Sequence, residues 1–300
     1  MRNALAALLA ALTLVSCGEQ AAQHAQSTIV VYVHERAEQM RFAEMLAEFT
    51  AETGIAVTAR YGNSRELTGA VIGKTDSPRA DVLLTSNAAD IWRAGNEGAL
   101  RPLPETVLHA LPEVLRDPDG AWVATLVRTP TLVAADGVAL EGIGSYTDLA
   151  APSLAGRLCI ASSRRPANRA LVAMLIESET AKPAERIVRG WVRNFAHPPY
   201  ASDGELLGAV HAGDCEIGLV ASGAGIGNLL QASLPGPYLD IDGIGVARHA
   251  GNPDGAHRFI EWIVARQSLG LSGGYFTMHV GVAGYRDEEA RLLAERAGYR

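Results

Sequence analysis

Two glycine-rich stretches of the chain have residue spacings close to those of cofactor-binding or catalytic motifs. Residues 223–228 read GAGIGN, which approaches a dinucleotide-binding pattern, and residues 270–274 read GLSGG, which matches the GxSxG pattern of nucleophilic serines. The first departs from the GxGxxG spacing. The second follows a predicted helix, whereas a nucleophile elbow follows a strand. The eight histidines form no HxxxH or HExxH pair. We therefore expect neither an enzyme nor a cofactor nor a metal site, and an activity screen with Ser272→Ala as control would test this.

The first residues, MRNALAALLAALTLVSCGEQ, combine Arg2 with an apolar run from Ala4 to Val15, which predicts a secretory signal too short to remain in a bilayer. Residues 14–17, LVSC, resemble the bacterial lipobox, in which cleavage leaves the cysteine as a lipidated first residue. The alternative is ordinary cleavage nearby, with Cys17 in the discarded peptide. We favour the lipoprotein interpretation: residues 1–27 form the signal and a polar tether, and the mature protein is periplasmic and membrane-anchored through Cys17.

The other two cysteines, Cys159 and Cys215, open the strand-like runs LCIAS and CEIGLV. In an oxidising compartment they favour a disulfide over a metal pair, which would need further ligands at suitable spacing. Starts of neighbouring parallel strands lie side by side, which would bring the two sulfurs together. The alternative is two separate buried thiols.

The formal net charge of -7 and the lack of a basic stripe argue against a nucleic-acid partner. With 300 residues and 48% hydrophobic content, two cores are expected. Apolar runs at 27–33, 55–62 and 80–86 predict strands, and the segments between them have helical spacing. A second alternation of strands and helices begins near residues 123–135.

This pattern predicts an α/β fold with two doubly wound sheets, each in its own lobe, joined by crossover strands. We assign 28–125 and 241–300 to the first lobe and 126–240 to the second. Ligands of open α/β sheets bind beyond the carboxyl ends of the strands, so two such lobes would hold a ligand between them and close by a hinge motion. The expected protein is a monomeric type 2 periplasmic solute-binding protein.

Several blocks of the chain resemble the ferric-iron-binding proteins of bacterial ABC importers. They include ARYGNSRELTGAV, ADVLLTSNAADIWRAGNEGALRPLP, GRLCIASS, AVHAGDCEIGLV and VARHAGNPDGAHRFIEWIV, in the family's order. The resemblance covers nearly the whole mature chain. It implies the two-lobed fold, an exported location, a small-molecule ligand and a membrane permease as partner.

The resemblance also implies an iron site built from tyrosinates with a histidine or a carboxylate, because Fe(III) prefers anionic oxygen donors. The positions of those ligands carry other residues here: Arg36, Ala167, Gly225, Ile226, and Ser86 or Asn87. His34, with Glu35, lies one or two places from the family's histidine position. We expect no tight Fe(III) binding and no tyrosinate colour, unless Tyr200, Tyr32 or Tyr146 reaches the metal.

Some features of an anion site remain. Arg128 aligns with an arginine that the family places near its anion, and Ser162 and Ser163 precede the helix that contains Asn168. Leu126 and Val127 replace a usual Ser-Gly pair. These replacements favour a bulky, largely apolar, lipid-like ligand held against Leu126, Val127, Ala167 and Ile226. The alternatives are a small anion or Fe(III), and a trafficking role outside ABC import is also open.

Overall fold

The computed structural model describes residues 28–35, 39–75, 77–222, 224–234, 236, 238–267, 269 and 278–300. Three of the positions singled out in the sequence, Cys17, Arg36 and Ser272, lie outside these ranges. No helix among the described residues is long and apolar enough to cross a bilayer.

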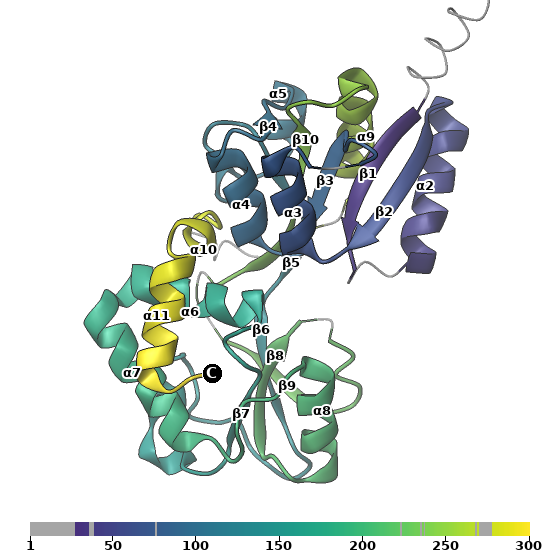
Figure 1. The fold of residues 1–300 in the computed structure, drawn as a ribbon. Helices are drawn as coiled ribbons and strands as arrows, with labels where there is room; N and C mark the ends of the chain where they lie inside the picture. Colours follow the sequence, from purple (N-terminus) through teal and green to yellow (C-terminus); the bar gives the residue numbers. More distant parts are fainter. Residues whose placement is uncertain are drawn as a thin grey trace, which may run out of the picture.

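The first sheet has six strands: β1 (Thr28–His34), β2 (Ala56–Gly62), β3 (Val82–Thr85), β4 (Leu100–Arg101), β5 (Val123–Arg128) and β10 (Asp240–Ala247). Their order is β2-β1-β3-β10-β4, and β5 also pairs with β10 (Figure 1). Strands β1, β2 and β3 are parallel, and β10 runs antiparallel to its neighbours. Both β3 and β10 are buried along their whole length, as expected of strands that are covered on both faces.

Six helical segments accompany this sheet: α2 (Gln39–Thr53), α3 (Ser64–Gly73), α4 (Ala88–Asn96), α5 (Glu105–His109), the 3-10 helix η1 (Glu113–Leu115) and α9 (Pro253–Arg266). Asparagines cap three of them, Asn63 at α3, Asn87 at α4 and Asn252 at α9. The side chain of Asn63 accepts from the backbone N–H groups of Arg65 and Glu66, and that of Asn87 accepts from Asp90. The helices α3 and α4 therefore start directly after the carboxyl ends of β2 and β3, at the edge where a ligand is expected.

The second sheet has the order β7-β8-β6-β9, from β6 (Pro130–Ala134), β7 (Leu158–Ile160), β8 (Ile217–Ala221) and β9 (Leu230–Ser233). Its helical segments are α6 (Pro166–Glu179), α7 (Ala181–Asn194), α8 (Asp203–Ala212) and the 3-10 helices η2 (Asp148–Ala150) and η3 (Pro152–Leu154). Gly218 lets α8 pack closely on β8, because a Cβ there would lie 2.5 Å from Leu206 Cδ2. Two sheets with flanking helices confirm the predicted type 2 fold.

The chain crosses between the sheets twice. It passes from β5 to β6 through Thr129, and it returns between the end of β9 and the start of β10. Although residues 126–128 were assigned to the second lobe, they continue β5 in the first sheet, where Arg128 pairs with Asp240.

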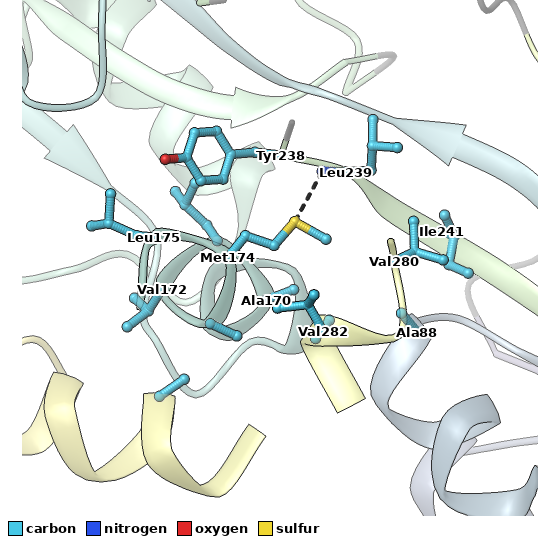
Figure 2. Close-up of a cluster of buried hydrophobic side chains, with 14 of the residues drawn as sticks. Ala88, Ala170, Val172, Met174, Leu175, Tyr238, Leu239, Ile241, Val280 and Val282 are labelled. Carbon is cyan, nitrogen blue, oxygen red and sulfur yellow. Dashed lines mark hydrogen bonds between the residues drawn. The ribbon is translucent and has the colours of Figure 1, made fainter. Parts of the chain in front are cut away.

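Residues 278–300 join the two halves, and we call them the bridging segment. Its helices are α10 (Val282–Tyr285), which contacts both α4 and α6, and α11 (Asp287–Ala297), which packs on α6 and α7 (Figure 1). The sequence assigned these residues to the first lobe, but α11 lies on helices of the second. Figure 2 shows the shared core at this junction, in which Met174 of α6 lies near Leu239 and Val282.

Candidate ligand-binding site

A pocket lies where the crossover segments meet the second sheet, and the space in and in front of it, open solvent included, is about 450 Å³. Its lining comes from the first crossover, the start of α6, the start of α8, the end of β8 and the second crossover. The lining residues are Arg128, Thr129, Pro130, Ala167, Asn168, Leu171, Asp203, Leu219, Val220, Ala221, Tyr238, Leu239 and Asp240. The position beyond the carboxyl end of β8 agrees with the rule for open α/β sheets. Of the residues predicted to bind a ligand, Arg128, Ala167 and Asn168 line this pocket.

An arginine between two aspartates connects the crossover strands. The Nη2 atom of Arg128 lies 3.0 Å from Asp240 Oδ2 and 2.7 Å from Asp242 Oδ1, and it donates to the backbone oxygen of Ser86 at 3.3 Å. Burial by itself would lower the pKa of Arg128, but the two carboxylates raise it above its ordinary value. One guanidinium therefore faces two carboxylates.

His34 completes the hinge cluster, which we define as His34, Arg128, Asp240 and Asp242. Its Nε2 atom lies 3.2 Å from Asp242 Oδ2, and its side chain is almost fully buried. Burial acts to raise the pKa of Asp242, but the hydrogen bond from His34 and the charge of Arg128 outweigh it, so that this pKa lies below its usual value. The His34 Nδ1 atom is buried and has no hydrogen-bond partner among the described residues.

The predicted polar residues of the first lobe have mainly structural contacts. Asn87 caps α4, and its Nδ2 atom donates to Asp90 Oδ2 at 2.8 Å. Ser86 reaches Arg128 through its backbone oxygen, and its backbone N–H donates to Ser64 Oγ. Both side chains lie at the carboxyl end of β3, but neither lines the pocket.

The expected anion site at the start of α6 is occupied by contacts within the protein. Ser162 Oγ accepts from the backbone N–H of Arg164, and Ser163 Oγ donates to the backbone oxygen of Tyr299 at 2.7 Å. Asn168 donates to Tyr299 and to Ala161. The sequence signal missed Tyr299 because nothing in the spacing shows that α11 returns to this helix.

Of the four residues expected to form an apolar wall, Ala167 lines the pocket, whereas Leu126, Val127 and Ile226 lie elsewhere. Ile226 is 8% exposed and packs in the core cluster of the second lobe with Leu206 and Val210, because an apolar side chain is stabilised there rather than on a wet surface. Leu126 points outward and is 46% exposed. Val127 contacts the large core cluster and does not line the pocket. Gly225 has a φ of +75°, a conformation that a side chain would strain.

The three tyrosines that were considered as possible metal ligands, Tyr200, Tyr32 and Tyr146, make other contacts and do not line the pocket. Tyr32 donates to the backbone oxygen of Pro78, Tyr146 is buried against Tyr238, and Tyr200 packs beside His197. Tyr238 lines the pocket, but its hydroxyl is hydrogen-bonded to Ser178 at 3.1 Å. Among the described residues, no group of three or more His, Cys, Asp or Glu side chains could hold a metal ion.

Two aspartates of the site were not singled out in the sequence, although a signal existed. Asp240 and Asp242 stand two positions apart at the start of β10, and a strand with period two places such residues on one face. A pair of charged residues in an otherwise apolar strand indicates a polar site. Asp203 was also missed. It lines the pocket from the start of α8 and pairs with Arg165 at 2.5 Å.

Cys159 and Cys215 form a disulfide in the structure, with their Cα atoms 6.3 Å apart. Cys159 lies on β7 and Cys215 precedes β8, and these two strands pair in parallel. The bridge lies beside the core under α8, on the side of the sheet away from the lining residues Ala167 and Leu171 of α6.

This fold and this hinge site define a bacterial extracellular solute-binding protein, and the chain belongs to that family, which matches residues 16–269. It is 33% identical over 243 residues to Iron uptake protein A1 of Synechocystis, covering 74% of this chain and 67% of the relative. It is 27% identical over 294 residues to the Fe(3+)-binding periplasmic protein of Serratia marcescens, covering 92% and 85%. A solved structure of the Trichodesmium protein IdiA (FutA) with iron and citrate ligands superimposes with a TM-score of 0.80 at 26% identity, covering 91% of this chain and 100% of that chain.

These comparisons overturn the predicted lipid-like ligand. The two relatives described above are both named for iron, and the structure places Ile226 and Leu126 outside the pocket that the apolar interpretation assigned to them. The error arose because the loss of the tyrosines was taken as a change of ligand class. Lipid binding is therefore wrong as an account of this site, and the lipoprotein assignment gains no support from relatives that are described as periplasmic proteins. The family consists of solute-binding transport proteins, as expected.

Proposed function

We propose that the chain is the solute-capturing component of a bacterial ABC importer for ferric iron, and that the iron arrives already bound to a small chelating acid. This proposal rests on the similarity to Iron uptake protein A1 over 74% of the chain. The importer's permease would be its membrane partner, and the periplasm its location. The lipid anchor expected at Cys17 lies outside the described residues and stays a prediction from the sequence alone.

The chelated form follows from the donors that the pocket offers. Fe(III) requires several anionic oxygen ligands. Within the described part of the chain, the pocket holds one tyrosine, whose hydroxyl is already hydrogen-bonded, and two aspartates that face arginines. A hydroxycarboxylic acid such as citrate would supply the missing inner ligands, and the protein would contact the outside of the complex.

The charged groups of the hinge cluster favour a metal complex over a free anion as the ligand. Arg128 is the cation nearest the pocket in this cluster, and it is bonded to both Asp240 and Asp242. A bare anion would meet the carboxylates of Asp240 and Asp242 beside Arg128, whereas water molecules coordinated to a ferric ion carry acidic hydrogens that carboxylates accept.

The test is iron retention. The purified protein is incubated with ferric citrate, passed through a desalting column and assayed for iron by mass spectrometry, with iron-free citrate as a calorimetric control. We expect about one iron per chain and no tyrosinate-to-iron absorption in the visible range. Absence of retained iron would overturn the proposed function. A strong visible band would show direct tyrosinate ligation and would overturn the chelated form.

A further inference from the structure

We propose that Tyr299 fixes the orientation of the Asn168 amide, so that its carbonyl oxygen is presented to the pocket and selects a cargo that carries hydrogen-bond donors. Asn168 would then be a specificity-determining residue and Tyr299 a positioning residue. The inference rests on the proposed function for the nature of the cargo, and those donors would be water molecules or hydroxyl groups on a ferric chelate.

The orientation follows from the partners of the amide nitrogen. Asn168 Nδ2 lies 2.9 Å from the backbone oxygen of Ala161 and 2.9 Å from the hydroxyl oxygen of Tyr299. A backbone carbonyl can only accept, so the NH2 group must face Ala161. The Tyr299 hydroxyl donates its own hydrogen to the same carbonyl at 2.5 Å, so it accepts from Asn168. Both amide hydrogens are thereby used.

The carbonyl oxygen of Asn168 is left for a ligand. No hydrogen bond to its Oδ1 atom is found among the described residues, and Asn168 lines the pocket. Rotation of the amide by a half turn would bring Oδ1 against the Ala161 oxygen, two acceptors in contact, and would lose both present hydrogen bonds. The surrounding protein therefore holds an acceptor toward the pocket.

Tyr299 is held firmly enough to act in this way. Its side chain is fully buried, its ring packs edge-on against Phe195, and its backbone oxygen accepts from Ser163. Burial raises the pKa of Tyr299, so the phenol stays protonated and keeps its donor hydrogen at physiological pH. The bridging segment thus reaches the wall of the ligand pocket through one hydroxyl group.

The other polar groups of the pocket strengthen the preference for donors. Asp203 and Asp240 are carboxylates, which only accept when they are ionised. The guanidinium groups beside them are bonded to carboxylates, Arg165 to Asp203 and Arg128 to Asp240 and Asp242. A ligand that enters the pocket therefore meets the Asn168 carbonyl as an acceptor, beside cations that already face carboxylates.

The test compares Tyr299→Phe with Tyr32→Phe. Each change deletes one buried phenol hydroxyl that donates to a backbone carbonyl, but Tyr32 bonds to Pro78 and lies outside the pocket. Urea unfolding checks that both variants fold. Ferric citrate is the binding probe. We expect Tyr299→Phe to weaken its binding about tenfold and Tyr32→Phe to leave binding within about twofold, since a misoriented amide costs roughly one hydrogen bond.

A second measurement does not depend on binding. In the ligand-free protein, the side-chain NH2 signals of Asn168, assigned by comparison with Asn168→Ala, should exchange slowly with solvent and should exchange at least tenfold faster in Tyr299→Phe. Equal exchange in both proteins overturns the inference, as does equal ferric citrate binding by Tyr299→Phe and Tyr32→Phe. If the unsubstituted protein fails to bind ferric citrate, the proposed function fails, and the exchange measurement alone decides whether Tyr299 orients Asn168.

Discussion

At the scale of single residues, the hinge cluster contains charge pairs whose members cannot be replaced independently. Asp240, Asp242 and Arg128 are largely buried, and each side chain has an oppositely charged neighbour. Removing one partner of a buried pair leaves the other charge without compensation, which costs more than the pair itself contributes.

The contribution of Asp242 to the stability of the protein can be measured through its dependence on pH. Its pKa is lowered in the folded protein, so the stability it contributes is complete above the ordinary aspartate range near pH 4 and is lost as the pH falls through the folded pKa. We expect Asp242→Asn to lower the free energy of unfolding at pH 7 by about 2–4 kcal/mol. Urea unfolding between pH 7 and pH 3 should show a shallower acid loss in the variant, and two parallel curves would contradict this assignment.

At the scale of elements, the sequence predicted most strands and helices because their hydrophobic periods are clear. The strand predicted within 80–86 and the helix from Ser64 to Gly73 appear where the pattern placed them. The site was predicted less well. Contacts such as Ser163 with Tyr299 join residues 136 positions apart, and no local pattern reports them. Ile226 shows the same difficulty, since apolarity alone cannot distinguish a pocket wall from a core.

The packing of α10 on α4 depends on a glycine. A Cβ at Gly284 would lie 2.3 Å from Trp92 Cγ, so Gly284→Ala must push the two helices apart. We expect a loss of about 1–3 kcal/mol in the free energy of unfolding and a shift in tryptophan emission. Gly208→Ala is the control, because the same Cβ on α8 meets nothing within 4 Å; it should stabilise by up to about 1 kcal/mol. Equal effects at both glycines would refute this account.

The disulfide joins β7 to the segment before β8 and closes a loop with a sequence separation of 56. On the chain-entropy model, Cys159→Ser with Cys215→Ser should lower the free energy of unfolding by about 4 kcal/mol. Thiol counting in denaturant without reductant should find neither cysteine free in the unsubstituted protein. Since the bridge lies outside the pocket, ferric citrate binding by the folded variant should be unchanged; two titratable thiols in the parent would disprove the bridge.

At the scale of the whole molecule, the two halves are connected by more than the crossover strands. Asp287 of the bridging segment pairs with Arg169 of α6 at 2.6 Å and with Arg65 of α3 at 3.4 Å, so one carboxylate contacts helices that flank different sheets. Hinge closure in such proteins changes the relation between those sheets. The Arg65 contact is therefore one that a lobe movement would break or make.

Arg65→Ala should loosen the relative placement of the lobes without unfolding either of them. Arg65 is 57% exposed, so the expected loss in unfolding free energy is below about 1 kcal/mol. Spin labels on α2 and α8 should report a broader distance distribution, which ferric citrate narrows again. Arg189→Ala, which removes a pair within α7, is the control and should leave the distribution unchanged. An unaltered distribution in Arg65→Ala would exclude this role for the contact.

The place of β10 in the first sheet has a consequence for how the chain acquires its structure. This strand lies between β3 and β4 and also pairs with β5, yet it follows the whole of the second sheet in the sequence. Whether during synthesis or export, a chain that appears in sequence order has all the strands of the second sheet available before residue 240 appears. The first sheet cannot be completed, and one edge of β3 stays unpaired, until β10 has appeared. We therefore expect the second sheet to form earlier than the first, and the exposed edge of β3 to be the place where a chaperone or a second chain would interfere with maturation.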